Sequence, residues 1–417
     1  MAGSEGRPVR RIAITGMGAI SALGIGANAL WQGMRDARSA IAPLVPPTNG
    51  AGGSEAGIRM KVAAQVRGFD PAAHFSSAQL ALLDRVSQFA LLAADEAVAQ
   101  SGLVFDEANA GRAAVVIGTG VGGEVARDEQ SRRLYRDNAE RVHPMSIVRI
   151  MPSAPASQVG IRFGLKGPGF AVSSACASSN HAIAQAALML RHGLADVALA
   201  GGTEACFSLP GIRAWEAMRV VADDSCRPFC VQRRGLVLGE GAGMFVLEEI
   251  EHARARGAVI LAELAGFGMT SDAGDIVAPS ANGAADAMRM ALRDARLDPA
   301  DIDYINAHGT GTQLNDSTET RAIHLAFGGH AGALAVSSTK GVHGHALGAA
   351  GALELVAAIG ALRDQVVPPT ANFIDPDPEC DLDYVPNAAR TMPVHAVLSN
   401  SFAFGGLNAV LALRQAG

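Results

Sequence analysis

A strand–turn–helix segment occurs twice in this chain, and the repetition restricts the possible folds more than any other feature. Ala171–Leu190 and Ala335–Glu354 align without a gap. The identical pairs are Ala171/Ala335, Val172/Val336, Ser173/Ser337, Ser174/Ser338, His181/His345, Ala182/Ala346 and Ala186/Ala350. The similar Val116–Gly120 (VIGTG) and Ala307–Thr312 (AHGTGT) each lie upstream of one copy. We therefore expect two duplicated halves; the alternative is a chance match between two Ala-rich segments.

Short apolar strands alternate with helices along the chain, which is the pattern of an α/β fold with buried sheets. A helix is expected over Leu80–Leu103, ending at Gly102. Strands are expected at Arg11–Ile20, Ala113–Ile117, Val197–Leu199 and Gly243–Leu247. The seam between the halves is placed near Arg256–Leu261, which gives an N-terminal half 1–258 and a C-terminal half 259–417. No low-complexity linker separates them, so they are expected to pack as one body.

Composition excludes several classes of protein. A net charge of -6 and only 18% charged residues give no basic face for nucleic acid. No run approaches the ~18 apolar residues of a membrane span, and no apolar stretch of signal-peptide form follows Met1–Arg11. The 5 cysteines are an odd number, and Cys226 and Cys230 lack the further Cys/His pair that a zinc site needs. A reducing cytoplasm is the expected location.

Cys176 lies in the turn of the first copy, just before its helix. Backbone N–H groups and the helix dipole would stabilise a thiolate there, so we expect a lowered pKa and a nucleophilic sulfur. The alternative is a buried structural cysteine, which is the usual state of a free thiol.

His308 follows a predicted strand within Asn306–Asp316 (NAHGTGTQLND). Its flanking glycines place it on a loop that a substrate can approach, and the hydroxyls of Thr310 and Thr312 are spaced to line a channel. A histidine that only caps its own loop is the alternative.

The second copy supplies Lys340 and His345. By the repeat, Lys340 aligns with Cys176 and His345 with His181. If the halves pair about a pseudo-twofold axis, the two turns meet and bring Cys176 close to both residues. His343 beside His345 could indicate a metal site, but no carboxylate cluster supports one.

Asn400–Asn408 (NSFAFGGLN) is a Gly-containing turn with Phe402 and Phe404. Adjacent glycines permit backbone movement, so Phe404 could gate an acyl tunnel. A hydrophobic plug of the core is the alternative.

Together these segments resemble the elongating β-ketoacyl-acyl-carrier-protein synthases of the thiolase superfamily, over nearly the whole chain. The resemblance rests on Ile12–Gly24, Ala175–Ser178, Asn306–Thr312, Ser338–Gly351 and Asn400–Gly406, which occur in the family's order. It implies an α/β fold of five layers, αβαβα, built from two duplicated halves, with the active site between them. It also implies a homodimer that works with acyl carrier protein, without a metal or dissociable cofactor.

The resemblance further implies a decarboxylative condensation of an acyl group on Cys176 with malonyl-carrier. His308 and His345 would assist decarboxylation and stabilise the enolate oxygen, and Lys340 and Glu354 would support the site. The amides of Cys176 and Phe404 would form the oxyanion hole. The implied substrate-binding residues are Thr310 and Thr312 for the phosphopantetheine arm, Val121 for acyl length, Phe402, and Arg219 for the acidic carrier.

The sequence departs from the family pattern at several positions. Cys230 and Arg234 stand where acidic residues are usual, His343 and Leu407 where threonine is common, and Ala403 where glycine is common. None of these changes removes a catalytic group. With these residues and the small Val121, the sequence is more similar to specialised relatives that build polyene or nodulation-type acyl chains than to housekeeping synthases.

Rival interpretations predict different residues. A thiolase uses one histidine and a second cysteine late in the chain, whereas this chain has two histidines. An initiation synthase has a Cys-His-Asn set, and the presence of His345 argues against that class. A silent chain-length factor lacks the nucleophile, although pairing with such a partner in a heterodimer stays open.

Overall fold

The computed structural model describes residues 10–47 and 57–416. The N-terminal segment for which no signal peptide was expected lies, up to residue 9, outside the described residues. Within the described ranges, no helix has the length and apolar character needed to cross a bilayer.

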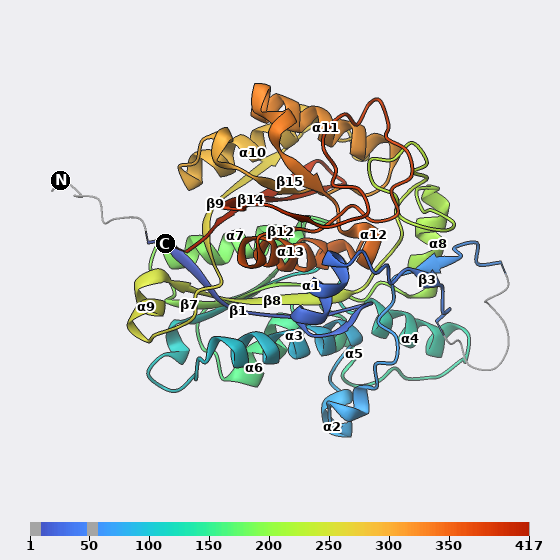
Figure 1. Cartoon of the computed structure of the whole chain (residues 1–417). Helices are drawn as coiled ribbons and strands as arrows, with labels where there is room; N and C mark the ends of the chain where they lie inside the picture. The colour runs from blue at the N-terminus through green and yellow to red at the C-terminus, as the bar shows by residue number, and fades with distance from the viewer. Residues whose placement is uncertain (1–9, 48–56, 417) are drawn as a thin grey trace.

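Helices and sheets stack in alternating layers (Figure 1). From one outer face to the other, the layers are helices α10 (Ala281–Ala295) and α11 (Gln313–Phe327), a sheet, helices α7 (Ser178–Arg191) and α13 (Ala350–Asp364), a second sheet, and helices α3 (Arg85–Ser101) and α6 (Ala154–Phe163). This is the expected five-layer αβαβα arrangement. The fold class predicted from the sequence is confirmed.

The strand order shows the duplication. The first-half strands run β1-β8-β7-β5-β6, and the second-half strands run β9-β15-β14-β10-β11 in the equivalent order. Their bounds are β1 Ile12–Ser21, β5 Ala113–Gly118, β6 Gly169–Val172, β7 Val197–Glu204, β8 Gly241–Glu249, β9 Ala262–Ser271, β10 Tyr304–Asn306, β11 Ala335–Ser337, β14 Ala396–Ala403 and β15 Leu407–Arg414. In both sets the last two strands pair in parallel and the first two pair antiparallel.

Strand β1 joins the two sets into one sheet of 11 strands. It pairs with β8 along its whole length, and through Ile12–Ile14 it also pairs with β9. Every residue of β1 is buried. The predicted boundary after residue 258 falls between α9 (Ile250–Ala255) and β9.

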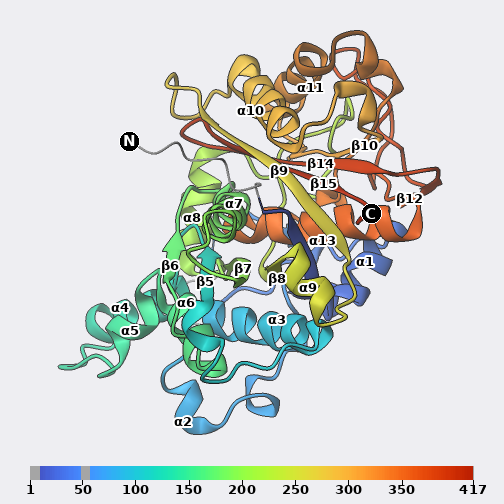
Figure 2. The same ribbon diagram turned by 90° about the vertical axis from the view of Figure 1, so that its left-hand side faces the viewer.

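Helices α7 and α13 form the middle layer (Figure 2). All residues of α13 from Ala350 to Leu362 are buried. Gly351 faces the side chain of Asn180 on α7, and a Cβ atom there would lie 2.2 Å from Asn180 Oδ1. The small residues predicted to permit close packing therefore do so at the centre of the molecule.

The two copies of the repeat differ in the structure after their turns. In the first copy α7 begins at Ser178, but in the second copy α12 (Lys340–His343) and a 3₁₀ turn (Leu347–Ala349) precede α13. His181 lies on α7 whereas His345 lies before α13, so the ungapped equivalence of these two histidines is wrong. An extra turn of chain in the second copy displaces the helix.

The helix expected over Leu80–Leu103 is shorter than predicted. Leu80 ends a separate helix α2 (Ser77–Leu80), and α3 begins after Asp84, whose carboxylate accepts a hydrogen bond from Val86 N at 2.9 Å. The C-terminal end is confirmed, since Gly102 caps α3 with φ 66°.

Candidate functional site

Cys176 sits in the turn between β6 and α7. The turn is closed by hydrogen bonds from Ala177 N to Ser174 O (3.1 Å) and from Ser178 N to Ala175 O (3.2 Å). Ala175 adopts a left-handed conformation with φ 49°, which costs a non-glycine residue roughly 1–2 kcal/mol. The chain thereby holds the sulfur at the helix N-terminus, where the sequence predicted it.

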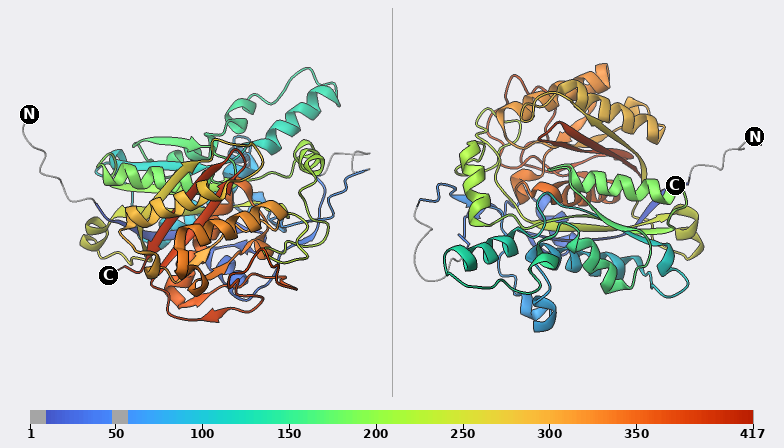
Figure 3. Two further views of the ribbon diagram at one scale, coloured as in Figure 1. Left: turned by 90° about the horizontal axis from the view of Figure 1, so that it is seen from above. Right: turned by 180° about the vertical axis from the view of Figure 1, so that it is seen from behind.

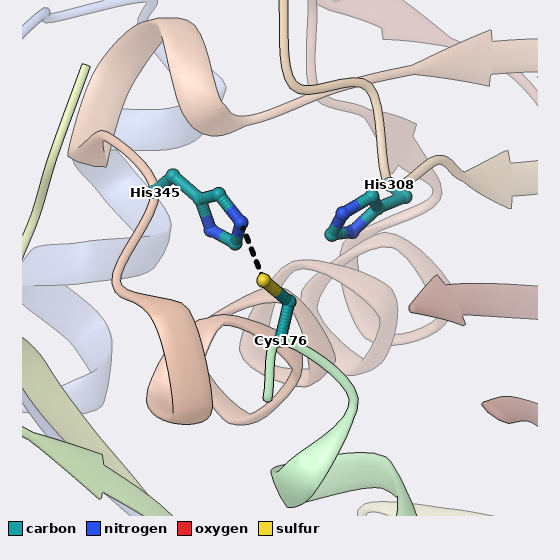
Figure 4. Close-up of side chains that lie close together, drawn as sticks. All are labelled: Cys176, His308 and His345. Atoms are coloured by element: carbon teal, nitrogen blue, oxygen red, sulfur yellow. Dashed lines mark hydrogen bonds between the residues drawn. The ribbon is translucent and has the colours of Figure 1, made fainter. Parts of the chain in front are cut away.

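Both predicted histidines reach Cys176 from the second half (Figure 4). His308 follows β10, and His345 lies between α12 and α13. Nε2 of His345 lies 3.1 Å from Cys176 Sγ. The ring centroids of His308 and His345 are 5.2 Å apart, and the ring planes make an angle of 83°. The predicted convergence of one thiol and two imidazoles is present in the structure.

Burial controls the protonation of all three groups. Desolvation raises the pKa of the Cys176 thiol to about 12, although the positive charge of Lys340 opposes the rise. The expectation of a lowered pKa is therefore wrong, because the free-energy cost of burying a thiolate exceeds the stabilisation that the helix N-terminus and Lys340 give it. Burial, followed by the charge of Lys340, also holds the pKa of His308 and of His345 well below the usual range. Both imidazoles are neutral at physiological pH.

Lys340 and Glu354 form an ion pair behind His308, and both side chains are fully buried. The Lys340 ammonium also donates to the backbone oxygen of His308 and lies 3.4 Å from its Nδ1. Burial raises the pKa of Glu354 to about 7 against the opposing charge of Lys340. The pair fixes the position of His308 without lining the pocket.

Two buried carboxylates brace the loop that carries His308. Glu319 accepts hydrogen bonds from His308 N and Gly309 N, both at 2.8 Å, and Asp316 accepts from Gly311 N at 3.2 Å. Sequence reasoning missed both residues in this role. The signal was present in acidic residues that recur on helix α11 directly after the GTGT loop.

Glu204 is a third buried carboxylate that the sequence did not reveal. It accepts hydrogen bonds from Gly120 N (2.7 Å), Val121 N (3.3 Å), Gly348 N (2.9 Å) and the hydroxyl of Thr119 (3.1 Å). Burial raises its pKa to about 7. Glu204 thus joins the loop of Val121 to the second half.

A cavity of about 450 Å³ leads to the sulfur, a size usual for a small-molecule site. Most of the predicted site residues line it, namely Cys176, His308, His345, Thr310, Thr312, Phe402, Phe404 and Arg219. Lys340 and Glu354 lie behind the wall. Val121 lies outside this cavity, with 39% of its surface exposed in the single chain. His343 and Leu407 do not line it either, whereas Ala403 and Arg234 do.

Phe404 begins the turn that joins β14 to β15. Its ring stacks on Trp215 of α8 (Leu209–Met218), with centroids 6.3 Å apart and an interplanar angle of 26°. Gly405 and Gly406 follow at φ 83° and 67°, values that favour glycine. Trp215 is a further pocket residue that sequence reasoning missed, because nothing local marks a tryptophan on an amphipathic helix as the partner of a distant turn.

The thiol and the two imidazoles could also be considered as metal ligands. Among the described residues, one ligand atom from each of Cys176, His308 and His345 lies within 4.8 Å of the others. His343 does not belong to this group; it is in hydrogen-bond contact with the Thr339 hydroxyl at 2.9 Å. The Lys340 ammonium beside His308 opposes a bound cation electrostatically, so the arrangement favours acyl chemistry.

Two family models match the chain. "Beta-ketoacyl synthase, N-terminal domain" matches residues 9–253, and "Beta-ketoacyl synthase, C-terminal domain" matches residues 261–374.

Known proteins match the chain over nearly its whole length. "Nodulation protein E" of Rhizobium sp. (strain N33) is 51% identical over 97% of this chain and 99% of the relative. "3-oxoacyl-[acyl-carrier-protein] synthase 2" of Coxiella burnetii (strain RSA 493 / Nine Mile phase I) is 41% identical over 97% of this chain and 99% of that relative. The solved structure "The ishigamide ketosynthase/chain length factor" superposes with a TM-score of 0.91 at 34% identity, covering 98% of this chain and 100% of that chain.

Proposed function

The chain belongs to the β-ketoacyl synthase family, and from that premise we propose how its residues divide the work of condensation. The enzyme is an acyltransferase that joins an enzyme-bound acyl group to malonyl-acyl-carrier protein with loss of carbon dioxide. The product is a 3-oxoacyl-acyl-carrier protein for fatty acid or polyketide synthesis. The observation that carries the assignment of roles is the convergence of Cys176, His308 and His345 at the end of one cavity.

In the first step Cys176 Sγ attacks the thioester carbonyl of the acyl-carrier. A new thioester forms on Cys176, and the carrier leaves as a thiol. Because the resting thiol is neutral, its proton must leave as the sulfur attacks, and His345 Nε2 at 3.1 Å is placed to take it. The proton then passes to the departing carrier sulfur. The amides of Cys176 and Phe404, both on the pocket wall, hold the oxyanion.

In the second step malonyl-carrier loses carbon dioxide, and the electron pair of the broken bond moves onto the thioester oxygen. His308 and His345 donate hydrogen bonds to this enolate oxygen. Neutral imidazoles suit the task, since their donors meet a charge that develops mainly in the transition state. The enolate carbon then attacks the acyl group on Cys176, and the carbon–sulfur bond to Cys176 breaks. The released sulfur takes a new proton from water through His345, because its first proton left with the carrier thiol.

The remaining residues support these steps. Lys340 and Glu354 position His308. Thr310 and Thr312, whose hydroxyls lie 2.9 Å apart, bind the phosphopantetheine arm. Phe404 gates the cavity, and Phe402 contacts the acyl group. Val121, which lies outside the cavity of the single chain, would act at the interface of a homodimer, where its small side chain leaves room for a medium or longer chain.

The chain is proposed to act as a homodimer. Strand β6 pairs with β5 on one side and lies at the edge of the sheet (Figure 2). Beside it α4 (Glu124–Tyr135) and α5 (Ser146–Ile150) project from the body (Figure 3). Phe170 of β6 is 38% exposed and Ile147 of α5 is 75% exposed. A free edge flanked by apolar side chains suits pairing with a second copy.

Acyl carrier protein is the partner in the reaction, and the acidic carrier is proposed to meet Arg219. A heterodimer remains the second candidate assembly, because the structure of the ishigamide protein includes a chain length factor.

Higher identity to "Nodulation protein E" than to "3-oxoacyl-[acyl-carrier-protein] synthase 2" supports a specialised acyl product. All 5 cysteines are free thiols, which supports the cytoplasm as the location.

Mass spectrometry of the intact protein tests these roles. After incubation with a panel of acyl-carriers, we expect one acyl group on Cys176, and after malonyl-carrier is added, loss of that group and a 3-oxoacyl-carrier two carbons longer. Cys176→Ala should carry no acyl group, whereas the control Cys380→Ala should behave as wild type. His308→Ala should become acylated but condense roughly 100-fold more slowly. Acylation of a cysteine other than Cys176 would refute the assignment.

A further inference from the structure

The wall of the catalytic cavity carries positive charge. Arg219, Arg233 and Arg234 line the cavity, and no Asp or Glu occurs among the described residues of its wall. Arg233 is buried and forms an ion pair with Asp377, so its charge is neutralised inside the fold. Arg219 and Arg234 are exposed. Two guanidinium groups are therefore presented to whatever enters.

Backbone pairing brings together the chain segments that carry these two arginines. Val221 and Leu236 form a parallel bridge, with Leu236 N donating to Val220 O at 2.9 Å and Ala222 N donating to Leu236 O at 2.8 Å. Arg219 and Arg234 each lie two positions before one of the bridged residues, and both line the same cavity.

Neither arginine forms an ion pair with a described side chain. Glu216, the acid nearest to Arg219 in sequence, pairs with Arg213, and Asp224 binds Arg227 through both of its carboxylate oxygens at 2.9 Å. Arg219 ends helix α8 in a left-handed conformation, with φ 57°. Two cations on the wall of one cavity repel each other, and an anion bound between them removes that repulsion.

The arginine pair adjoins the threonine loop. Gly235 N, directly after Arg234, donates a hydrogen bond to Gly311 O at 2.9 Å. Gly311 lies between Thr310 and Thr312, the proposed contacts of the pantetheine arm. A ligand whose thioester lies at Cys176 and whose amides pass the threonines therefore reaches the arginines with its far end.

We propose that Arg219 and Arg234 jointly bind the phosphodiester of the carrier's phosphopantetheine arm, an inference that rests on the proposed function. The phosphodiester is the anionic group that every acyl carrier holds at a fixed distance from its thioester. Guanidinium forks match phosphate oxygens in geometry and charge. Arg234 stands where an acidic residue is usual in this family, so the second half of this site is a property of this chain.

The test compares two small thioesters that differ in one phosphate. Acyl-pantetheine and acyl-phosphopantetheine are offered to wild type, Arg219→Gln, Arg234→Gln and the double variant, and the rate of Cys176 acylation is followed by mass spectrometry. Wild type should prefer the phosphorylated compound. Each single variant should raise the KM for that compound about 5-fold, with kcat unchanged, and the double variant should lose the preference. Arg234→Asp, which restores the family's charge, should have a larger effect than Arg234→Gln.

Arg296→Gln is the matched control, because Arg296 is also an exposed arginine that ends a helix in a left-handed conformation. It should change neither KM. An equal rise in KM for both thioesters would overturn the proposal. So would an effect seen only with the intact carrier, which would assign the arginines to carboxylates of the carrier. If wild type failed to accept either thioester on Cys176, the proposed function would fail instead, and the two failures are thus distinguishable.

Discussion

At the scale of single residues, the buried charge of Lys340 influences every reacting group. It opposes the rise in the pKa of Cys176 and helps to keep His308 and His345 neutral. Its own charge is balanced by Glu354 in an environment without solvent. Removing one member of a buried pair leaves the other charge uncompensated.

Lys340→Met is expected to destabilise the fold by about 3–5 kcal/mol, because Glu354 would lose its partner. Urea unfolding measures the loss. The double variant Lys340→Met/Glu354→Gln should recover part of it, since no isolated charge is then buried. Equal destabilisation of the single and double variants would show that the ion pair is not the cause.

His343 should make the fold sensitive to acid. Burial lowers its pKa from 6.5 to about 3, so the unfolded chain binds a proton between these values and the folded chain does not. The stability contributed by the neutral ring is complete above pH 6.5 and is lost as the pH falls toward 3. Between pH 7.5 and 5, this one group accounts for about 2 kcal/mol.

His343→Thr, which introduces the residue common in the family, should remove that share of the pH dependence. Urea unfolding of both proteins at pH 7.5 and pH 5 gives the comparison. Parallel losses in the two proteins would contradict the assignment to His343.

Val121→Phe should shorten the product, because a phenyl ring would fill space that the small side chain leaves. Gas chromatography of the released acyl chains measures the distribution. Val259→Phe, at a position that is 75% exposed near the seam, is the control. An unchanged distribution in Val121→Phe would remove this residue from chain-length control.

At the scale of elements, helix α8 links three parts of the site. Trp215 stacks on Phe404, Glu216 accepts a hydrogen bond from Met60 N at 2.8 Å, and Arg219 ends the helix at the cavity mouth. Residues four positions apart lie on one face of a helix, so Trp215 and Arg219 both face the cavity. Helix α8 therefore connects Arg219 on the cavity wall to the stack of Trp215 on Phe404.

Trp215→Ala should loosen Phe404 and expose the sulfur behind it. Since an aromatic pair contributes roughly 0.5–1.5 kcal/mol, alkylation of Cys176 by a bulky iodoacetamide should become roughly 3- to 10-fold faster. Trp215→Phe, which keeps a stacked ring, should react at close to the wild-type rate. No acceleration in the alanine variant would mean that the stack does not hold the gate.

The elements differ in how far the sequence predicted them. Long apolar runs and the repeated strand–turn–helix pattern were sufficient for β1, β5, the turn of Cys176 and the relation between the halves. The extra turn before α13 could not be predicted, because the ungapped match beyond Ser338 holds for only one histidine and two alanines. The stack of Trp215 on Phe404 joins segments far apart in the chain, and no local pattern encodes such a contact.

At the scale of the whole molecule, the sequence predicted which groups meet but not their protonation. The types of residue and their motifs identified Cys176, His308 and His345. The pKa of the thiol depends on its burial by side chains from both halves, which a local argument from the helix N-terminus omits. The bracing carboxylate Glu204 was missed for the same reason, since its partners belong to distant segments of the chain.

Phe170→Glu should convert the proposed homodimer into monomers, because it places a charge on the free edge at β6. Light scattering after size-exclusion chromatography measures the mass. Val104→Glu alters a more exposed apolar residue, at 76%, away from that strand and serves as control. A wild-type chain that is monomeric alone would contradict the homodimer and favour a different partner subunit.

The central position of β1 has a consequence for biosynthesis. A ribosome makes this buried, mostly apolar strand early, yet its neighbours β8 and β9 begin only at residues 241 and 262. Until then the strand pairs only with the two residues of β2 (Gly24–Ile25), and long-range pairing of the kind made with β8 and β9 is slow and prone to aggregation. Nascent chains of this enzyme should therefore need shielding by a chaperone for more than half of their synthesis.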